Sequence, residues 1–264
     1  MTGQIMSNID VAQIVLYVFW IFFAGLIFYI RREDRREGYP LEDDLTGEQV
    51  STGVIWVPSP KAFHLANGET VYAPNGKRDL RQINAEPVAP WPGAPLEPLG
   101  NPLTAGVGPG SWAERADVPD VTPTGAPRIV PIGSALSFAI EARDKDPRGL
   151  PVVGGDGKVA GTVTDVWVDV SESLIRYLEA SVGVGEAAKT VMIPMQFASV
   201  YRTPVFGQPG KGKVEVSALL STQFGDVPPL KSPGTITLLE EEKVTAYFGA
   251  GTLYATPDRQ EPFI

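Results

Sequence analysis

Four carboxylates and one arginine gather in a short stretch of the second half of the chain: Asp165, Asp169, Glu172, Arg176 and Glu179. Carboxylates beside an arginine in a partly buried turn have shifted pKa values, and such groups can pass protons. Glu172 and Arg176 are four residues apart, so they would pair if the turn is locally helical. The spacing leaves two interpretations open: a proton-conducting cluster, or a solvated loop with a surface salt bridge.

Two glycine-rich stretches resemble nucleotide-binding loops but do not fit them. Residues 106–110 lack the dinucleotide spacing, and Pro109 removes an N–H group that would face a phosphate. Residues 154–158 are followed by Val159, where a P-loop needs Ser or Thr. Both stretches are predicted to be turns. His64 is interpreted as a packed or surface histidine, because no carboxylate and nucleophile are identified near it.

Composition excludes several kinds of site. The chain has 264 residues, no cysteine, one histidine and a formal net charge of −9. Disulfides, thiolate zinc sites, iron–sulfur clusters and centres with several histidines are therefore excluded within one chain, and no metal site is predicted. The acidic balance also argues against nucleic-acid binding, which needs clustered Lys and Arg.

The acidic cluster lies where one predicted strand turns into the next. Residues 160–170 and 174–182 are the two strands, and in the first of them valines alternate with Trp167 and Asp169, as in a half-buried strand. Asp156 and Gly157 suit a tight hairpin turn. Further strands are predicted at residues 151–153, 189–195, 213–219 and 235–239. Strands at such short spacing indicate a small antiparallel barrel or sandwich.

A short helix is predicted near the C-terminal end. Three glutamates and Lys243 open it, because acidic residues in a first turn complement the helix dipole. It is predicted to run to Tyr247 and to end at Gly249 and Gly251.

The N-terminal part contains a candidate membrane span. Residues 11–30 carry no charge, and as a helix they would extend roughly 30 Å, the thickness of the bilayer core. A cleaved signal peptide and a buried core helix are the alternatives. The first lacks a basic leading segment, and the second rarely stays uncharged for so long.

The flanks of this span predict its orientation. Arg31, Arg32, Arg35 and Arg36 follow it directly, and no basic residue precedes it. By the positive-inside rule the N-terminus is periplasmic and the rest of the chain is cytoplasmic. The same arginines are predicted to contact lipid headgroups, with Tyr29 in the interface. The first 40 residues carry four acids and four arginines, so the whole net charge of −9 lies beyond them.

Between the span and the strands lies a proline-rich region. Residues 54–57 and 69–72 have β character, whereas residues 87–131 hold 11 of the 25 prolines and cannot form a regular helix or central strand. Trp91, Leu96, Leu99 and Trp112 favour an ordered strap laid over a surface, and a flexible linker is the alternative.

Four blocks of sequence carry a resemblance to a known family. They are FWI, AGL and RREGYPL within residues 19–41, VGPGSWAER at 107–115, DPRGLPV and GTVTDVWVD within 146–169, and LLEEEK to YATP at 238–257. In this order they resemble the H subunit of the purple bacterial photosynthetic reaction centre, a PRC-barrel family.

The resemblance implies a fold and a function. It implies a single N-terminal transmembrane helix and a mainly β cytoplasmic domain, a small antiparallel barrel, with a short C-terminal helix. It implies a non-enzymatic subunit in a photosynthetic membrane that caps the L and M subunits, shields the quinone sites and relays protons to the secondary quinone. The partners would hold the bacteriochlorophyll, bacteriopheophytin, carotenoid, quinones and non-haem iron. A cytochrome subunit and a light-harvesting antenna are further candidate partners.

The resemblance also implies residue roles. Glu172 matches the proton-relay glutamate, Asp169 and Arg176 match its neighbours, and Asp120, Arg128 and Glu241 match other members of the charged network. One difference matters. Where some members carry an aspartate and two histidines at the point of proton uptake, this chain has Thr122, Thr124 and Ala126, which do not titrate near neutral pH.

The predicted organisation has five parts: residues 1–10 periplasmic, 11–30 the membrane helix, 31–131 the basic cluster and strap, 132–248 the β domain and 249–264 a tail. Two other functions remain as alternatives, a membrane-tethered barrel module that binds another protein and a hydrolase with paired carboxylates.

Overall fold

A computed structural model describes residues 4–6, 9–43, 46–77, 82–183, 188–202 and 212–260. The chain forms two compact units: Met1–Gln82 with Pro87–Pro95, and Ile83–Glu86 with Leu96–Ile264. Each unit is described by itself.

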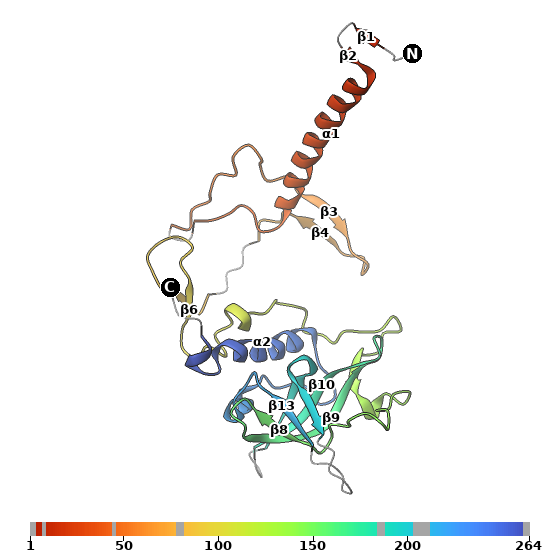
Figure 1. Cartoon of the computed structure of the whole chain (residues 1–264), viewed down its shortest axis with the longest axis vertical. Coiled ribbons are helices and arrows are strands. Elements are labelled where there is room, and N and C mark those ends of the chain that lie inside the picture. The colour runs from red at the N-terminus through yellow and green to blue at the C-terminus, as the bar shows by residue number, and fades with distance from the viewer. Residues whose placement is uncertain are drawn as a thin grey trace. The chain divides into compact units, whose positions relative to one another are not determined.

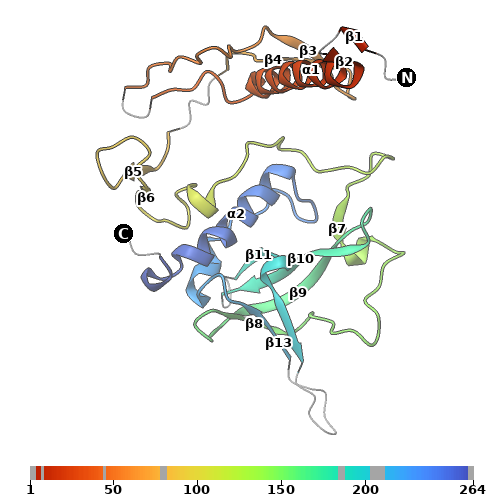
Figure 2. The same ribbon diagram turned by 45° about the horizontal axis from the view of Figure 1, so that its top comes forward.

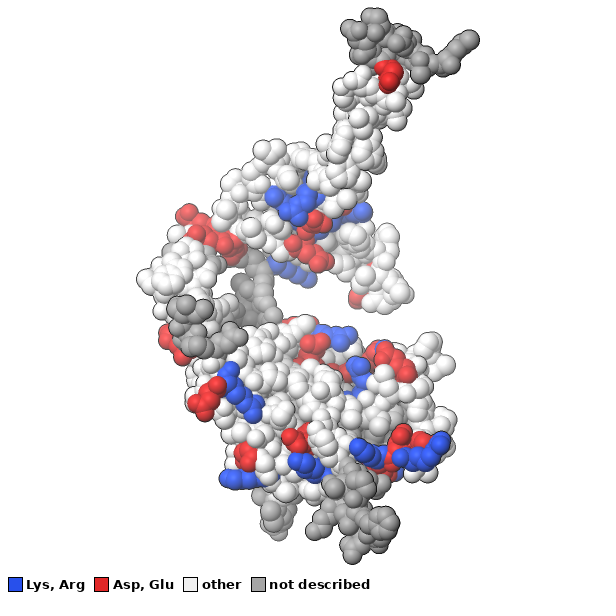
Figure 3. Space-filling view, in the orientation of Figure 1, with Lys and Arg blue, Asp and Glu red and all other residues white. Residues whose placement is uncertain are grey.

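The first unit is built on the helix α1 (Val11–Glu33), which follows two short paired strands, β1 (Gln4–Met6) and β2 (Ile9–Asp10). Asp10 caps the helix, because its Oδ1 accepts a hydrogen bond from Gln13 N at 2.8 Å. The helix is long and apolar enough to cross a membrane. Its middle is free of charge, and acidic and basic side chains gather at its C-terminal end (Figure 3). The predicted span is confirmed as a helix and continues three residues further.

Beyond η1 (Asp34–Arg36), strands β3 (Lys61–His64) and β4 (Thr70–Ala73) form a hairpin. The prediction of a strand at residues 54–57 was wrong. Arg35 Nη1 donates hydrogen bonds to Thr52 O, at 2.9 Å, and to Ile55 O, so these carbonyls serve a side chain and not a strand ladder. His64 lies exposed on the hairpin, with Nδ1 3.0 Å from Thr70 Oγ1, as expected for a surface histidine.

The second unit contains a curved, half-barrel sheet (Figure 1). Its strand order is β11-β10-β9-β8-β13-β12, and β7 pairs with β9 beside this path. The strands are β7 (Ile129–Pro131), β8 (Pro151–Gly154), β9 (Val159–Asp169), β10 (Leu174–Val182), β11 (Lys189–Pro194), β12 (Ser199–Arg202) and β13 (Gly212–Val216). The mainly β fold is confirmed, but one pair, β13 with β8, is parallel. The short strands β7 and β12 were not predicted.

Strand β9 is the centre of the sheet. Alternation predicted that it is half-buried, which holds for its first part, where Val163 is buried between exposed Thr162 and Thr164, but not for Val166, Trp167, Val168 and Asp169, which are all buried. The edges of β9 are paired with β10, β8 and β7, and its second part lies within the hydrophobic core.

The helix α2 (Leu238–Tyr254) lies across the sheet (Figure 2). Phe248 of this helix packs on Phe197 and Phe224, which puts the helix into the hydrophobic core. The predicted strand at residues 235–239 was wrong. Thr237 Oγ1 accepts from Glu240 N and Glu240 Oε2 accepts from Thr237 N, a capping box that starts the helix here.

The prediction that this helix ends at Gly249 and Gly251 was also wrong. Both glycines lie inside α2, where a Cβ atom would lie 2.5 Å from Pro109 O and 2.4 Å from Ala218 O. The glycines are there because backbone from other segments packs directly against the helix.

The proline-rich region contains β5 (Ala85–Pro87) and β6 (Leu96–Pro98), which pair, and η2 (Gly108–Gly110), which contacts α2. Leu103 and Ala105 are buried against the second unit, whereas Leu96 and Leu99 are exposed. Short 3-10 turns complete the fold at Ile132–Ser134, Met195–Phe197, Ser221–Asp226 and Pro257–Arg259.

Candidate functional site

Asp169 ends β9 and organises the turn into β10. Its side chain is 1% exposed, and its Oδ1 accepts hydrogen bonds from the backbone N–H groups of Ser171 and Glu172, both at 2.9 Å. Burial raises the pKa of Asp169, but the hydrogen bonds from Arg128 and from these two N–H groups outweigh it. The pKa of this carboxyl therefore lies below its usual range, and Asp169 is a fixed negative charge.

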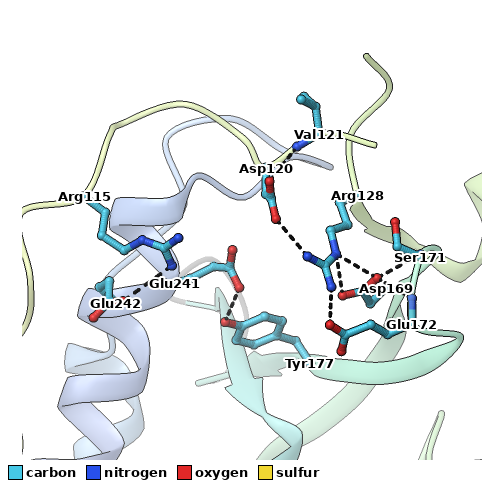
Figure 4. A network of polar contacts seen from close by, with 10 residues as sticks. All are labelled: Arg115, Asp120, Val121, Arg128, Asp169, Ser171, Glu172, Tyr177, Glu241 and Glu242. Carbon is cyan, nitrogen blue, oxygen red and sulfur yellow. Dashed lines mark hydrogen bonds and ion pairs between the residues drawn. The ribbon is translucent and has the colours of Figure 1, made fainter. Parts of the chain in front are cut away.

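Arg128 joins three carboxylates (Figure 4). Its Nε lies 2.9 Å from Asp169 Oδ2, its Nη1 donates to Asp120 Oδ2 at 3.3 Å, and its Nη2 is hydrogen bonded to Glu172 Oε1. The hydrogen bond to Asp169 is the main cause that raises the pKa of Arg128, so the guanidinium stays charged. One cation thus holds a buried acid and two more accessible acids together.

Pairing of β7 with β9 places Arg128 beside the turn. Ile129 lies opposite Asp169 in this ladder, and Val170 N donates to Arg128 O at 2.9 Å. Asp120 and Arg128 lie at the two ends of a small hairpin, in which Arg128 N donates to Asp120 O at 2.9 Å. The arginine and its partners therefore come from two separate segments of sequence, the hairpin at residues 120–128 and the turn at residues 169–172.

The expected pair of Glu172 with Arg176 is replaced by a pair with Arg128. The turn is not helical, because Ser173 has a φ of 57° and Leu174 starts the next strand. Arg176 is exposed on β10, where its charge opposes the rise in the pKa of Glu241.

A second acid, Glu241, enters the same region from α2. Its Oε2 accepts a hydrogen bond from Tyr177 OH at 3.1 Å. Burial raises the pKa of Glu241, and the negative charge of Asp120 acts in the same direction. The hydrogen bond from Tyr177 and the charges of Arg176 and Arg115 oppose this rise without cancelling it. Glu241 therefore takes up a proton more readily than an exposed glutamate does.

Asp165 and Glu179 lie apart from this cluster, opposite each other on β9 and β10. Glu179 accepts hydrogen bonds from Trp167 Nε1 at 3.0 Å and from Thr164 Oγ1 at 3.1 Å, which ties the two strands together. Within the described ranges, no group of three or more His, Asp or Glu side chains is placed to hold a metal ion.

Thr122, Thr124 and Ala126 belong to the small hairpin between Asp120 and Arg128. The hydroxyl oxygens of the two threonines lie 2.8 Å apart, and Thr122 N donates to Ala126 O. Positions 122, 124 and 126 of this hairpin therefore carry two hydroxyl groups and a methyl group, and none of these titrates near neutral pH.

The arginines at the end of the membrane helix divide into two kinds. Arg36 is 13% exposed and donates to Ser59 O and Ala73 O, both at 2.9 Å, while Arg35 holds the loop at residues 52–55. Arg31 is 67% exposed, and Tyr29 is exposed as well. Arg35 and Arg36 thus organise the chain that follows the helix.

Sequence reasoning did not find Tyr177. It lies within the strand predicted at residues 174–182, and only the position of α2 brings an acid to its hydroxyl group. A buried tyrosine hydroxyl usually has a hydrogen-bond partner, and this general rule is the one signal that could have indicated a polar contact of Tyr177.

Comparison with known families gives two matches. Residues 3–134, half of the chain, match the family described as photosynthetic reaction centre, H-chain N-terminal region. Residues 140–217, which contain strands β8 to β13, match the PRC-barrel domain.

Proposed function

We propose, because this chain belongs to the photosynthetic reaction centre H-chain family, that it caps the L and M subunits on their cytoplasmic side. In this position it shields the quinone sites from bulk water and relays protons to the secondary quinone. The chain itself is not an enzyme in this proposal. Bacteriochlorophyll, bacteriopheophytin, carotenoid, quinones and non-haem iron belong to partner subunits.

The proposed location is a bacterial photosynthetic membrane, crossed once by α1. The N-terminus is periplasmic and the β unit is cytoplasmic, because all four arginines that flank the apolar run at residues 11–30 lie on its C-terminal side. Arg31, Arg32 and Tyr29 contact lipid headgroups, whereas the internal hydrogen bonds of Arg35 and Arg36 favour a structural role for that pair.

The observation that carries the relay is the set of three acids on Arg128. Asp169 is buried and ionised, so it keeps Arg128 in place, while the side chain of Glu172 remains 49% exposed and accessible to water. Glu172 is the group that gains and loses a proton. Asp120, Glu241 and Arg176 set the local charge around it.

The substitution Glu172→Gln tests the relay in the purified complex. It keeps the size of the side chain but removes the exchangeable proton, so flash-induced proton uptake and the second electron transfer to quinone should slow by about 100-fold, the lower end of the usual effect of a lost acid–base group. Glu215→Gln is the control, because Glu215 pairs with Lys213 on β13, outside the Arg128 cluster. Uptake at the wild-type rate in Glu172→Gln would show that the relay does not pass through this residue.

Partner identity is tested by purifying the tagged chain from photosynthetic membranes. Absorption bands of bacteriochlorophyll should copurify with it, together with two further subunits. A purified chain without pigment would support a membrane-tethered module that binds another protein.

A further inference from the structure

Tyr177 is a buried polar group for which the proposed relay gives no explanation. It is 4% exposed on β10, and its hydroxyl donates to Glu241 Oε2 at 3.1 Å. Thr245, one turn beyond Glu241 on α2, acts to lower the pKa of Tyr177, but burial outweighs this effect. Burial raises the pKa of Tyr177, so it stays protonated and acts as a donor throughout the neutral range.

Charged residues on two other parts of the fold affect the pKa of Glu241. Arg176 lies on β10 beside Tyr177, and Arg115 and Asp120 lie on the segment that precedes the small hairpin. Arg115 also pairs with the neighbouring Glu242, at 3.6 Å, so its charge is shared. Tyr177 is the described side chain that donates a direct hydrogen bond to the Glu241 carboxylate.

We propose that Tyr177 is a positioning residue of the relay. Its hydroxyl fixes one oxygen of Glu241, so that the other oxygen turns away from Tyr177, toward the region of Asp120 and Arg128 (Figure 4). The hydrogen bond also stabilises the ionised form of a carboxylate that burial disfavours. Glu241 can then release its proton as well as hold it. This inference rests on the proposed relay function.

The test is Tyr177→Phe in the purified complex, with the protonation of Glu241 followed by the infrared band of its carboxyl group. The band is assigned by its loss in Glu241→Gln. Without the donor, the proton affinity of Glu241 should rise about tenfold, because a hydrogen bond to a charged group stabilises that form by about the free energy of a tenfold change. The titration midpoint therefore moves to higher pH.

Tyr247→Phe is the matched control. Tyr247 is an equally buried tyrosine on α2, and its hydroxyl donates to a backbone oxygen, Gln223 O, at 2.9 Å. It should leave the midpoint unchanged. An unchanged midpoint in Tyr177→Phe, or an equal shift in both variants, would overturn the positioning role.

The pH profile of flash-induced proton uptake separates this inference from the relay itself. A shift of the profile to higher pH in Tyr177→Phe, parallel to the infrared midpoint, supports the role in the relay. An infrared shift without any change of the uptake profile overturns that role. Wild-type uptake in Glu172→Gln would overturn the relay alone, because the infrared titration does not depend on turnover.

Discussion

Asp169 shows how one buried carboxylate serves both folding and the site. It closes the β9–β10 turn through two backbone N–H groups and fixes Arg128 through its other oxygen. A buried acid of this kind is tolerated only because every charge is compensated. The position of the accessible Glu172 depends on this arrangement, because Asp169 holds the Arg128 guanidinium to which Glu172 is hydrogen bonded.

The substitution Asp169→Asn should lower the free energy of unfolding by about 1–3 kcal/mol at neutral pH, because Arg128 loses its buried counter-charge. The folded pKa of Asp169 is depressed, so its ionised form stabilises the fold above the usual aspartate pKa of about 3.9. That stabilisation is lost as the pH falls through the lower folded pKa. Denaturation of the chain in detergent, followed by tryptophan fluorescence, measures both effects.

Asp165→Asn is the control for this prediction. Asp165 lies on the same strand and accepts a hydrogen bond from Val166 N, away from Arg128. The change should alter stability by less than about 0.5 kcal/mol. A difference between wild type and Asp169→Asn that persists unchanged at acidic pH would contradict the ionised state of Asp169.

At the scale of elements, the glycines of α2 position the helix by letting other segments pack closely against it, and the helix does not end at them. The carbonyl of Ala218 packs against Gly251, and η2 packs against the same helix, with Gly110 next to Ala250. These approaches hold the helix on the sheet and so bring Glu241 to Tyr177. Glycine in a helix interior usually costs stability, and here close packing offsets that cost.

Gly251→Ala should therefore destabilise the fold by about 1–3 kcal/mol, the usual cost of overpacking, although helix propensity alone predicts a gain of about 1 kcal/mol. The new Cβ would meet Ala218 O at 2.4 Å, and backbone cannot move aside cheaply. Thermal unfolding in detergent measures the sign. Thr252→Ala, exposed on the same helix, is the control and should change little. A stabilised Gly251→Ala variant would rule out the close approach.

At the scale of the whole molecule, the membrane anchor and the β unit are separate bodies. The second unit contains the sheet, α2 and a core that includes Trp167, Phe224 and Phe248. Its buried hydrophobic residues pack against one another in a single cluster. We therefore expect the unit to fold without the anchor.

A fragment of residues 83–264 tests this expectation. It should unfold in one cooperative transition without detergent, because its sheet and α2 share one hydrophobic core. Circular dichroism and tryptophan fluorescence should give the same midpoint. The fragment carrying Gly251→Ala is the matched comparison and should melt at a lower temperature. A broad transition, or midpoints that differ between the two probes, would show that the β unit depends on the first unit.

The local features of the fold could be predicted because they depend on neighbouring residues. The charge-free run at residues 11–30 allows little besides a membrane helix, and the β-rich runs at residues 160–170 and 174–182 are strands in the structure. The predicted end of α2 failed because the role of Gly251 depends on Ala218, which is distant in sequence. Strand β7 was not predicted, because a strand of three residues is too short to show a periodic pattern.

By itself, the sequence determined the membrane helix, the β-rich unit and the lack of cysteine and multi-histidine sites. It also placed Asp169 and Glu172 on one turn. Only the tertiary structure decided that Arg128, and not Arg176, pairs with Glu172, and that Tyr177 meets Glu241. The physical reason is that these pairs follow from the register of β7 on β9 and from the packing of α2. Such long-range contacts are fixed by the burial of the whole core and not by the spacing of the residues that make them.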